Sequence, residues 1–314
     1  MIDFKFIPVK SLQKLNESLT ISTYDENITT LNLHKRRQIP ISFSSAIKFL
    51  HYINENQKSL YDASRKDKEV KELIFNESFS TAFQPILSLA EGGTIGFEVL
   101  NRPKSSVHFP TTEDFYNYIG KSNNVFKIEG FLRNLSLKRY AEQVRQTDSH
   151  EDGLIFLNIQ PQVLTDSAYR SGTTLDLLAK YGLSPDRVVL ELTEKEAVSD
   201  YQSFEKIIDN YRKQGFRIAI DDAGTGYNSL KTIISLKPEF IKLDKFLIRD
   251  IHIQPAQQQL VELLLGFAEQ SNTHMIAEGI ENVQELQYLK DLGVHFGQGY
   301  ALGRPQAVLK RGGI

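Results

Sequence analysis

From Phe79 onward, short apolar runs alternate with amphipathic stretches, and this alternation most restricts what the chain can fold into. Eight runs read as buried strands, at 82–87, 96–100, 154–159, 188–192, 218–220, 240–243, 275–277 and 295–300. Between them, apolar residues recur at helical spacing at 126–144, 204–211, 260–267 and 286–292. Buried strands separated by helices are typical of a parallel sheet covered on both faces. The sequence therefore predicts a (β/α)8 barrel, with an open doubly wound sheet as the alternative.

Most of these runs end in a carboxylate, an amide or a lysine. The residues are Glu98, Asn158, Glu191, Asp221 with Asp222, Lys242 and Glu278. In a (β/α)8 barrel the active site lies at the carboxyl ends of the strands. The pattern therefore predicts that successive strands deliver these side chains to one shared mouth.

Several carboxylates in one mouth must be neutralised. Two of them about 4 Å apart repel by roughly 4 kcal/mol at an effective dielectric constant near 20, so protonation or bound cations are required. A donor set of oxygens suits Mg2+ or Mn2+ better than zinc. The adjacent Asp221 and Asp222 suit two ions, and such a pair of ions is the standard apparatus for in-line displacement at a phosphodiester.

Each residue taken singly also has a structural explanation. Lys242 would neutralise Asp244 or Glu191, and Glu194 would share a capping arrangement with Thr193. These explanations are largely independent, so a shared site accounts for the whole series better. The seven histidines have no metal-binding spacing and are expected to be surface or packing residues.

Composition excludes several other classes of protein. The chain of 314 residues has a net charge of −2, which argues against a broad surface for a nucleic acid polymer or an acidic membrane. It has no cysteine, which excludes disulfides and a thiol nucleophile and fits a reducing compartment. No apolar run reaches the roughly 18 residues of a membrane span, and a signal peptide pattern is absent from the N-terminus. We expect a cytoplasmic protein without membrane insertion.

Residues 1–75 read differently from the rest. Alternation predicts three short strands, at 3–8, 19–24 and 29–33, and helical spacing predicts a helix through 46–53. We therefore predict a small α+β domain over 1–75, followed by the barrel over 76–314. No chemical motif occurs in the first domain, so a docking or dimerising role, including contact with a protein partner, is favoured over ligand sensing.

Seven motifs in the barrel region occur in a characteristic order. They are FQPI at 83–86, EVLNR at 98–102, ELTE at 191–194, DDAGTGY at 221–227, IKLD at 241–244, AEGIE at 277–281 and GQGY at 297–300. Together they resemble the EAL domain, the bacterial cyclic di-GMP phosphodiesterase, over about three quarters of the chain. The resemblance implies a (β/α)8 barrel whose first strand runs antiparallel. It also implies hydrolysis of cyclic di-GMP to linear pGpG by two divalent cations, Mg2+ or Mn2+.

The resemblance further assigns a role to each matching residue. The metal ligands would be Glu98, Asn158, Glu191, Asp221 and Asp222. Four residues would be catalytic. Lys242 would orient or polarise the attacking water, and Glu278 would be an essential carboxylate near that water. Glu194 would brace the loop after Asp222, and Gln298 would order the water network. The residues that face the dinucleotide would be Gln84, Leu100 and Arg102.

Three positions depart from the family pattern. Val99 replaces the usual alanine, Ala223 replaces a phenylalanine, and Asn228 replaces a serine. Loss of a buried ring at 223 would loosen the following loop by a few kcal/mol. In the family this loop couples metal binding to dimer contacts, so the resemblance also predicts a homodimer formed through 222–230 and the adjacent helix.

Two other functions fit part of the pattern. A receptor would bind cyclic di-GMP without turnover and signal through residues 1–75; Ala223 favours it, whereas the complete ligand set favours the enzyme. An unrelated barrel metalloenzyme acting on a small carbon acid would explain the carboxylates. It would leave Gln84, Arg102 and the ordered motifs unexplained.

Overall fold

The computed structural model describes residues 19–25, 28–33, 37–41, 62–122, 124–147, 153–160, 172–193, 201–224 and 229–314. The chain separates into two compact units, residues 1–76 and 77–314. The first contains a three-stranded antiparallel sheet, β1 (Leu19–Asp25), β2 (Ile28–Leu33) and β3 (Arg37–Ile41), and a helix over 62–75.

The small sheet confirms two of the predicted strands, as β1 and β2. The pattern does not predict β3, because Pro40 interrupts it. Proline removes a backbone donor and is tolerated on an edge strand, and β3 lies at the edge of the sheet order β1-β2-β3. The predicted strand 3–8 and helix 46–53 lie outside the described residues.

The second unit is a closed barrel of eight strands in the order β10-β11-β4-β5-β6-β7-β8-β9. The strands are β4 (Phe79–Ser88), β5 (Thr94–Pro103), β6 (Leu154–Ile159), β7 (Val188–Thr193), β8 (Arg217–Ala223), β9 (Phe240–Leu243), β10 (His274–Ala277) and β11 (Phe296–Gly297). This confirms the predicted (β/α)8 barrel and excludes the open sheet. The last strand is shorter than predicted, because the backbone of Gln298 turns to hydrogen bond with Ala277 and Ile280.

Strand β4 runs antiparallel to both of its neighbours, β5 and β11, while the remaining neighbours pair in parallel. Only residues 89–93 connect β4 to β5. A parallel crossover needs a dozen or more residues, so this short connection requires a hairpin. Ser88 and Gly93 close the hairpin, with the N–H of Ser88 donating to the carbonyl of Gly93 at 2.8 Å. The antiparallel first strand is thus confirmed.

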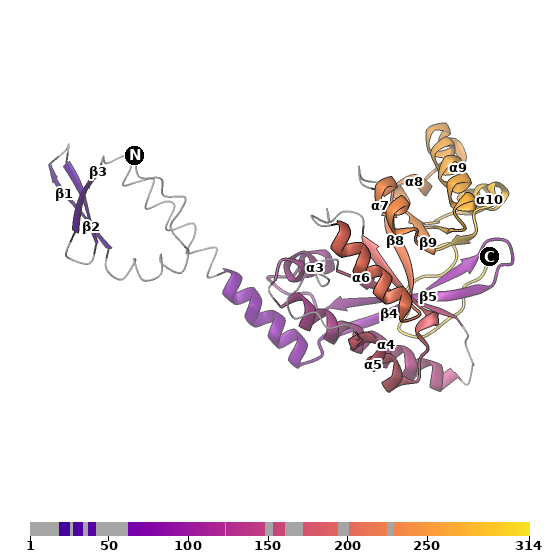
Figure 1. Ribbon diagram of the computed structural model, residues 1–314, viewed down its shortest axis with the longest axis horizontal. Helices are drawn as coiled ribbons and strands as arrows, with labels where there is room; N and C mark the ends of the chain where they lie inside the picture. The colour runs from indigo at the N-terminus through magenta and orange to yellow at the C-terminus, as the bar shows by residue number, and fades with distance from the viewer. Residues whose placement is uncertain are drawn as a thin grey trace. The chain divides into compact units, whose positions relative to one another are not determined.

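Helices lie around the outside of the strands (Figure 1). They are α3 (Thr112–Gly120), α4 (Val125–Thr147), α5 (Thr173–Tyr181), α6 (Tyr201–Lys213), α7 (Ser229–Leu236), α8 (Lys245–Ile248), α9 (Pro255–Gln270) and α10 (Val283–Leu292), with single 3-10 turns η3 (Pro185–Arg187) and η4 (Ile251–Ile253). Four of them, α4, α6, α9 and α10, confirm the predicted helices. The others are short, and their few turns give too little periodicity to detect. No helix in the described ranges has the length and apolarity to cross a membrane.

An apolar layer fills the interior of the barrel. Its buried members are Ile86, Phe156, Val189, Ala219, Phe240 and Ile276. Successive side chains of a strand point to opposite faces, so residues two positions apart share a face. Each member lies two positions along the chain from a residue of the predicted site, as Phe240 does from Lys242 and Ile276 from Glu278, just after β10. The apolar layer therefore forms the floor beneath that site.

Two histidines lie beside this layer, at the amino-terminal side of β10 and β11. His295 Nδ1 accepts a hydrogen bond from the N–H of Met275 at 3.1 Å, and the rings of His295 and His274 have centroids 5.4 Å apart. The neutral form of His295 is therefore the one that fits the folded chain.

The pH dependence of folding tests this contact. Burial lowers the pKa of His295, as does the neighbouring His274, while Glu269 acts in the opposite sense. His295 therefore binds a proton more readily in the unfolded chain than in the folded chain. The free energy of unfolding consequently falls as the pH drops below about 6.5, the ordinary pKa of histidine. In His295→Asn an amide oxygen can accept the same bond without titrating. Between about pH 7.5 and 5.5, we expect the urea midpoint to fall more for wild type than for the variant. Equal falls would contradict this.

Candidate active site

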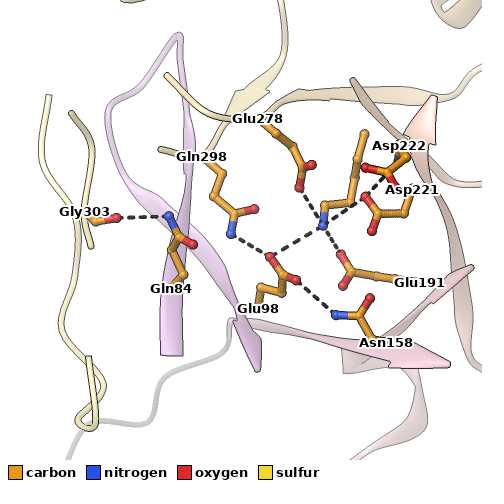
Figure 2. A network of polar contacts seen from close by, with 10 residues as sticks. Gln84, Glu98, Asn158, Glu191, Asp221, Asp222, Glu278, Gln298 and Gly303 are labelled. Atoms are coloured by element: carbon orange, nitrogen blue, oxygen red, sulfur yellow. Dashed lines mark hydrogen bonds and ion pairs between the residues drawn. The ribbon is translucent and has the colours of Figure 1, made fainter. Parts of the chain in front are cut away.

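Lys242 occupies the centre of the barrel mouth, and only 1% of its side chain is exposed. Its ammonium nitrogen lies 2.7 Å from carboxylate oxygens of both Glu191 and Glu278. It lies 3.5 Å from those of Glu98 and Asp221. Figure 2 shows the four carboxylates converging, three from separate strands and Glu278 from the loop that follows β10. The structure thus brings together five of the residues predicted from the strand ends.

Glu98 is held by two side-chain amides. Asn158 Nδ2 donates to one of its oxygens at 3.0 Å, and Gln298 Nε2 donates to the other at 2.7 Å (Figure 2). Burial by itself would raise the pKa of Glu98, but Lys242 and the two amides outweigh it and lower the pKa. Glu98 is therefore ionised, with both oxygens fixed in direction.

The other three carboxylates are less well compensated. Burial raises the pKa of Glu191, Asp221 and Glu278, and Lys242 offsets the effect only in part; the value for Glu278 rises to about 8. Burial disfavours the charge of Lys242 too, but the four carboxylates outweigh it and hold its pKa well above the usual range. One ammonium thus faces more negative charge than it can neutralise.

The donor set fits hard divalent cations. Oxygens of Asp221, Asp222 and Glu278 lie within 4.8 Å of one another, close enough to share an ion. Glu191 is fully buried, and its Oε2 has no hydrogen-bond partner among the described residues. An ion in reach of these oxygens would supply both the missing contact and the missing positive charge. Asp222 has a left-handed backbone, with φ of +57°, and its N–H donates to Asp221 Oδ1 at 3.0 Å.

Two cavities share Leu100, and the larger opens on this cluster. The larger, about 460 Å³, is lined by Glu98, Asp221, Asp222, Lys242 and Glu278, together with Gln84, Leu100, Lys245 and Tyr300 among others. The second, about 320 Å³, is lined by Leu100, Arg102, Tyr116, Glu129 and Asn158 among others. Leu100 lines both. The predicted dinucleotide-facing residues are therefore divided between the two cavities, and Gln84 is oriented by donation from its Nε2 to Gly303 O at 3.3 Å (Figure 2).

Some residues stand apart from their predicted places. Lys242 neutralises Glu191, whereas Asp244 instead caps α8 by accepting a bond from the N–H of Phe246 at 2.7 Å. Glu194 lies outside the described residues. Sequence reasoning misses Lys245 and Tyr116 as lining residues, since neither ends a strand nor carries a distinctive motif.

The loops after β10 and β11 pack closely together, and this contact fixes the position of the Gln298 backbone. The N–H of Ile280 donates to the carbonyl of Gln298 at 3.1 Å. A Cβ on Gly299 would lie 2.1 Å from the carbonyl oxygen of Ile280, so only glycine allows this approach. The loops after β10 and β11 are thereby joined at the mouth.

The loop after Asp222 begins in a packed environment. Ala223 is fully buried and pairs with Leu243. A side chain on the next residue, Gly224, would collide with Leu247, which closes over this point. The effect of Ala223 on the loop stays a prediction, and Asn228 lies outside the described residues.

Comparison with known proteins agrees with this geometry. Residues 67–305 match the model of the EAL domain. A relative, the probable cyclic di-GMP phosphodiesterase PdeB of Escherichia coli K12, is 28% identical over 232 residues, which cover 74% of this chain and 43% of the relative. The chain thus spans less than half the length of that protein.

Solved structures extend the comparison to the fold. The EAL enzyme Bd1971 in its cAMP and cyclic-di-GMP bound form superposes with a TM-score of 0.71 at 27% identity, over 83% of this chain and 71% of that one. The manganese/cy-diGMP complex of Klebsiella pneumoniae BlrP1 gives 0.63 at 25% identity, over 73% and 56%. With the family model matched across most of its length, the chain belongs to the EAL domain family.

Proposed function

We propose that this chain hydrolyses cyclic di-GMP to linear pGpG with two divalent cations, Mg2+ or Mn2+. The observation that carries the proposal is the cluster of four carboxylates around the buried Lys242, of which Glu98, Asp221 and Glu278 line the larger cavity. The names of the relative and of both solved structures, which refer to cyclic di-GMP, support the choice of substrate.

The metal ligands in this proposal are Glu98, Asn158, Glu191, Asp221 and Asp222. Bound there, the ions would supply an activated water and charge neutralisation at the phosphodiester. Glu98 presents its oxygens in fixed directions, because Asn158 and Gln298 hold them. Glu194 is proposed to brace the loop that begins at Asp222.

The remaining residues act on the water and on the substrate. Lys242 contacts Glu278 directly, so the two are placed to orient the attacking water and to handle its proton. Gln84, Leu100 and Arg102 would bind the dinucleotide, with the guanidinium of Arg102 suited to a phosphate or a guanine edge. Residues 1–75 are proposed to dock a protein partner, and the cytoplasmic location stays a prediction from composition.

Removal of the best-held carboxylate tests catalysis. We expect Glu98→Ala to lower the rate of pGpG formation by about a hundredfold or more, because it removes a metal ligand and the acceptor of two amides. Chromatography of the products formed with each ion gives the measurement. Glu142→Ala, on the exposed face of α4, is the matched control and should retain wild-type turnover. Undiminished hydrolysis by Glu98→Ala would rule out the assignment.

Ion binding has a readout that is independent of turnover. We expect Mg2+ or Mn2+ at about a hundred times its Kd to stabilise the wild-type fold by about 2.7 kcal/mol. Calorimetry should show the corresponding rise in Tm on addition of the ion and its reversal by chelator. The double variant Asp221→Asn, Asp222→Asn should lose most of that rise. The same gain in both proteins would argue against these ligands.

A receptor that binds cyclic di-GMP without turnover is the alternative, and Ala223 is the residue that favours it. The product assay separates the two functions. Binding by wild type without pGpG under either ion would favour the receptor.

We also infer a homodimer through 222–230 and α7. Two large apolar side chains near this segment are exposed, Ile234 on α7 by 59% and Phe246 on α8 by 70%. Burial of such side chains between two copies would stabilise the pair, by about 1.5–3 kcal/mol each.

The dimer is tested by light scattering at working concentration. Wild type should have the mass of two chains, and Ile234→Glu should shift the equilibrium towards the monomer by introducing an unpaired charge. Glu142→Ala again serves as the control. A monomeric wild type would contradict the inference.

A further inference from the structure

The carboxyl end of β5, which lines both cavities, extends beyond its pairing with β6 but remains paired with β4. Pairing of β5 with β6 stops at Val99, opposite Leu157. Pairing with β4 continues to Pro103, opposite Phe79. The segment 100–103, which contains Leu100 and Arg102, is therefore held by a backbone ladder on one side alone.

The side chain of Asn101 supplies the attachment on the other side. It is buried, and its Nδ2 donates to Ser136 Oγ at 2.7 Å and to Leu132 O at 3.2 Å, both on α4. Its Oδ1 accepts from Thr81 Oγ1 at 2.5 Å. Both amide hydrogens and the carbonyl oxygen are thus engaged, and a buried amide satisfied in this way has one fixed orientation.

Neighbouring groups hold the same segment. Tyr116 OH donates to the carbonyl of Asn101 at 3.2 Å from across the smaller cavity. Arg139 Nη1 donates to Thr81 Oγ1 at 2.7 Å and to Phe79 O at 2.8 Å. Asn101 is therefore the centre of a buried network that joins α3, α4 and β4 to the end of β5.

Asn101 is among the residues that line the smaller cavity, but its side chain makes its hydrogen bonds to α4 and β4. Leu100 and Arg102 point to the face opposite Asn101. We propose that Asn101 is a positioning residue, which fixes the segment 100–103 to α4 and thereby sets Leu100 and Arg102 against the cyclic dinucleotide. The role rests on the proposed function and adds a residue that acts through Leu100 and Arg102.

The variant Asn101→Leu tests this role, because leucine keeps the volume and removes the hydrogen bonds. We expect KM for cyclic di-GMP to rise about tenfold while kcat changes by less than about threefold, since the metal ligands stay in place. Ser136→Ala removes one of the two acceptors on α4 and should raise KM by about two- to threefold. This milder variant keeps the test valid if Asn101→Leu does not fold.

A control separates positioning from stability. Thr273→Val removes another buried hydrogen bond, from Thr273 Oγ1 to Pro238 O at 3.0 Å, at the amino-terminal end of β10. Both Thr273→Val and Asn101→Leu should lower Tm by a few degrees, but Thr273→Val should leave KM within about twofold of wild type.

Each outcome decides the proposal. A raised KM in Asn101→Leu and Ser136→Ala, but not in Thr273→Val, supports it. Unchanged KM in both variants of the network, with an active wild type, overturns the positioning role and leaves the proposed function standing. A wild type that neither binds nor hydrolyses cyclic di-GMP overturns both.

Discussion

Lys242 places one buried positive charge among four carboxylates, and the arrangement of the barrel mouth depends on this contact. Its pKa stays high because the carboxylates outweigh the cost of burial. The apolar layer immediately below excludes water and so strengthens every charge interaction above it. The site is thus an acidic shell with a single ammonium at its centre, and the negative charge left over suits divalent cations.

The geometry of this shell follows from the alternation of strands. Side chains two positions apart share a face, so Phe240, Val189 and Ala219 form the floor, while Lys242, Glu191 and Asp221 stand one level higher. A substitution that changes the volume of a floor residue would therefore shift the charged side chains directly above it. The same rule turns the side chain of Asn101 to the opposite face of β5, where it hydrogen bonds to α4.

Sequence reasoning finds the parts of this protein that repeat. The apolar runs predict the strands, and the polar residue that ends each run predicts the site, because in a closed barrel all the carboxyl ends of parallel strands meet. It does not find α3, which is too short to show a clear period, nor the short extent of β11, which is set by the turn at Gln298. The direction of β4 follows from the family resemblance and not from periodicity. The network at Asn101 depends on a helix about 35 residues later in the chain, a pairing that a local pattern cannot reveal.

The reversed direction of β4 has a consequence for how the barrel is entered. In a barrel of parallel strands alone, the first strand begins at the end far from the active site. Here Phe79, the first residue of β4, pairs with Pro103 at the carboxyl end of β5. The polypeptide thus enters the barrel at the end that carries the carboxylate cluster, one strand away from Arg102. The first residues of β4 therefore belong to the rim of the cavities, so a change of backbone at Phe79 would reach Arg102 across a single strand pairing, whereas the far end of the barrel is a whole strand length away.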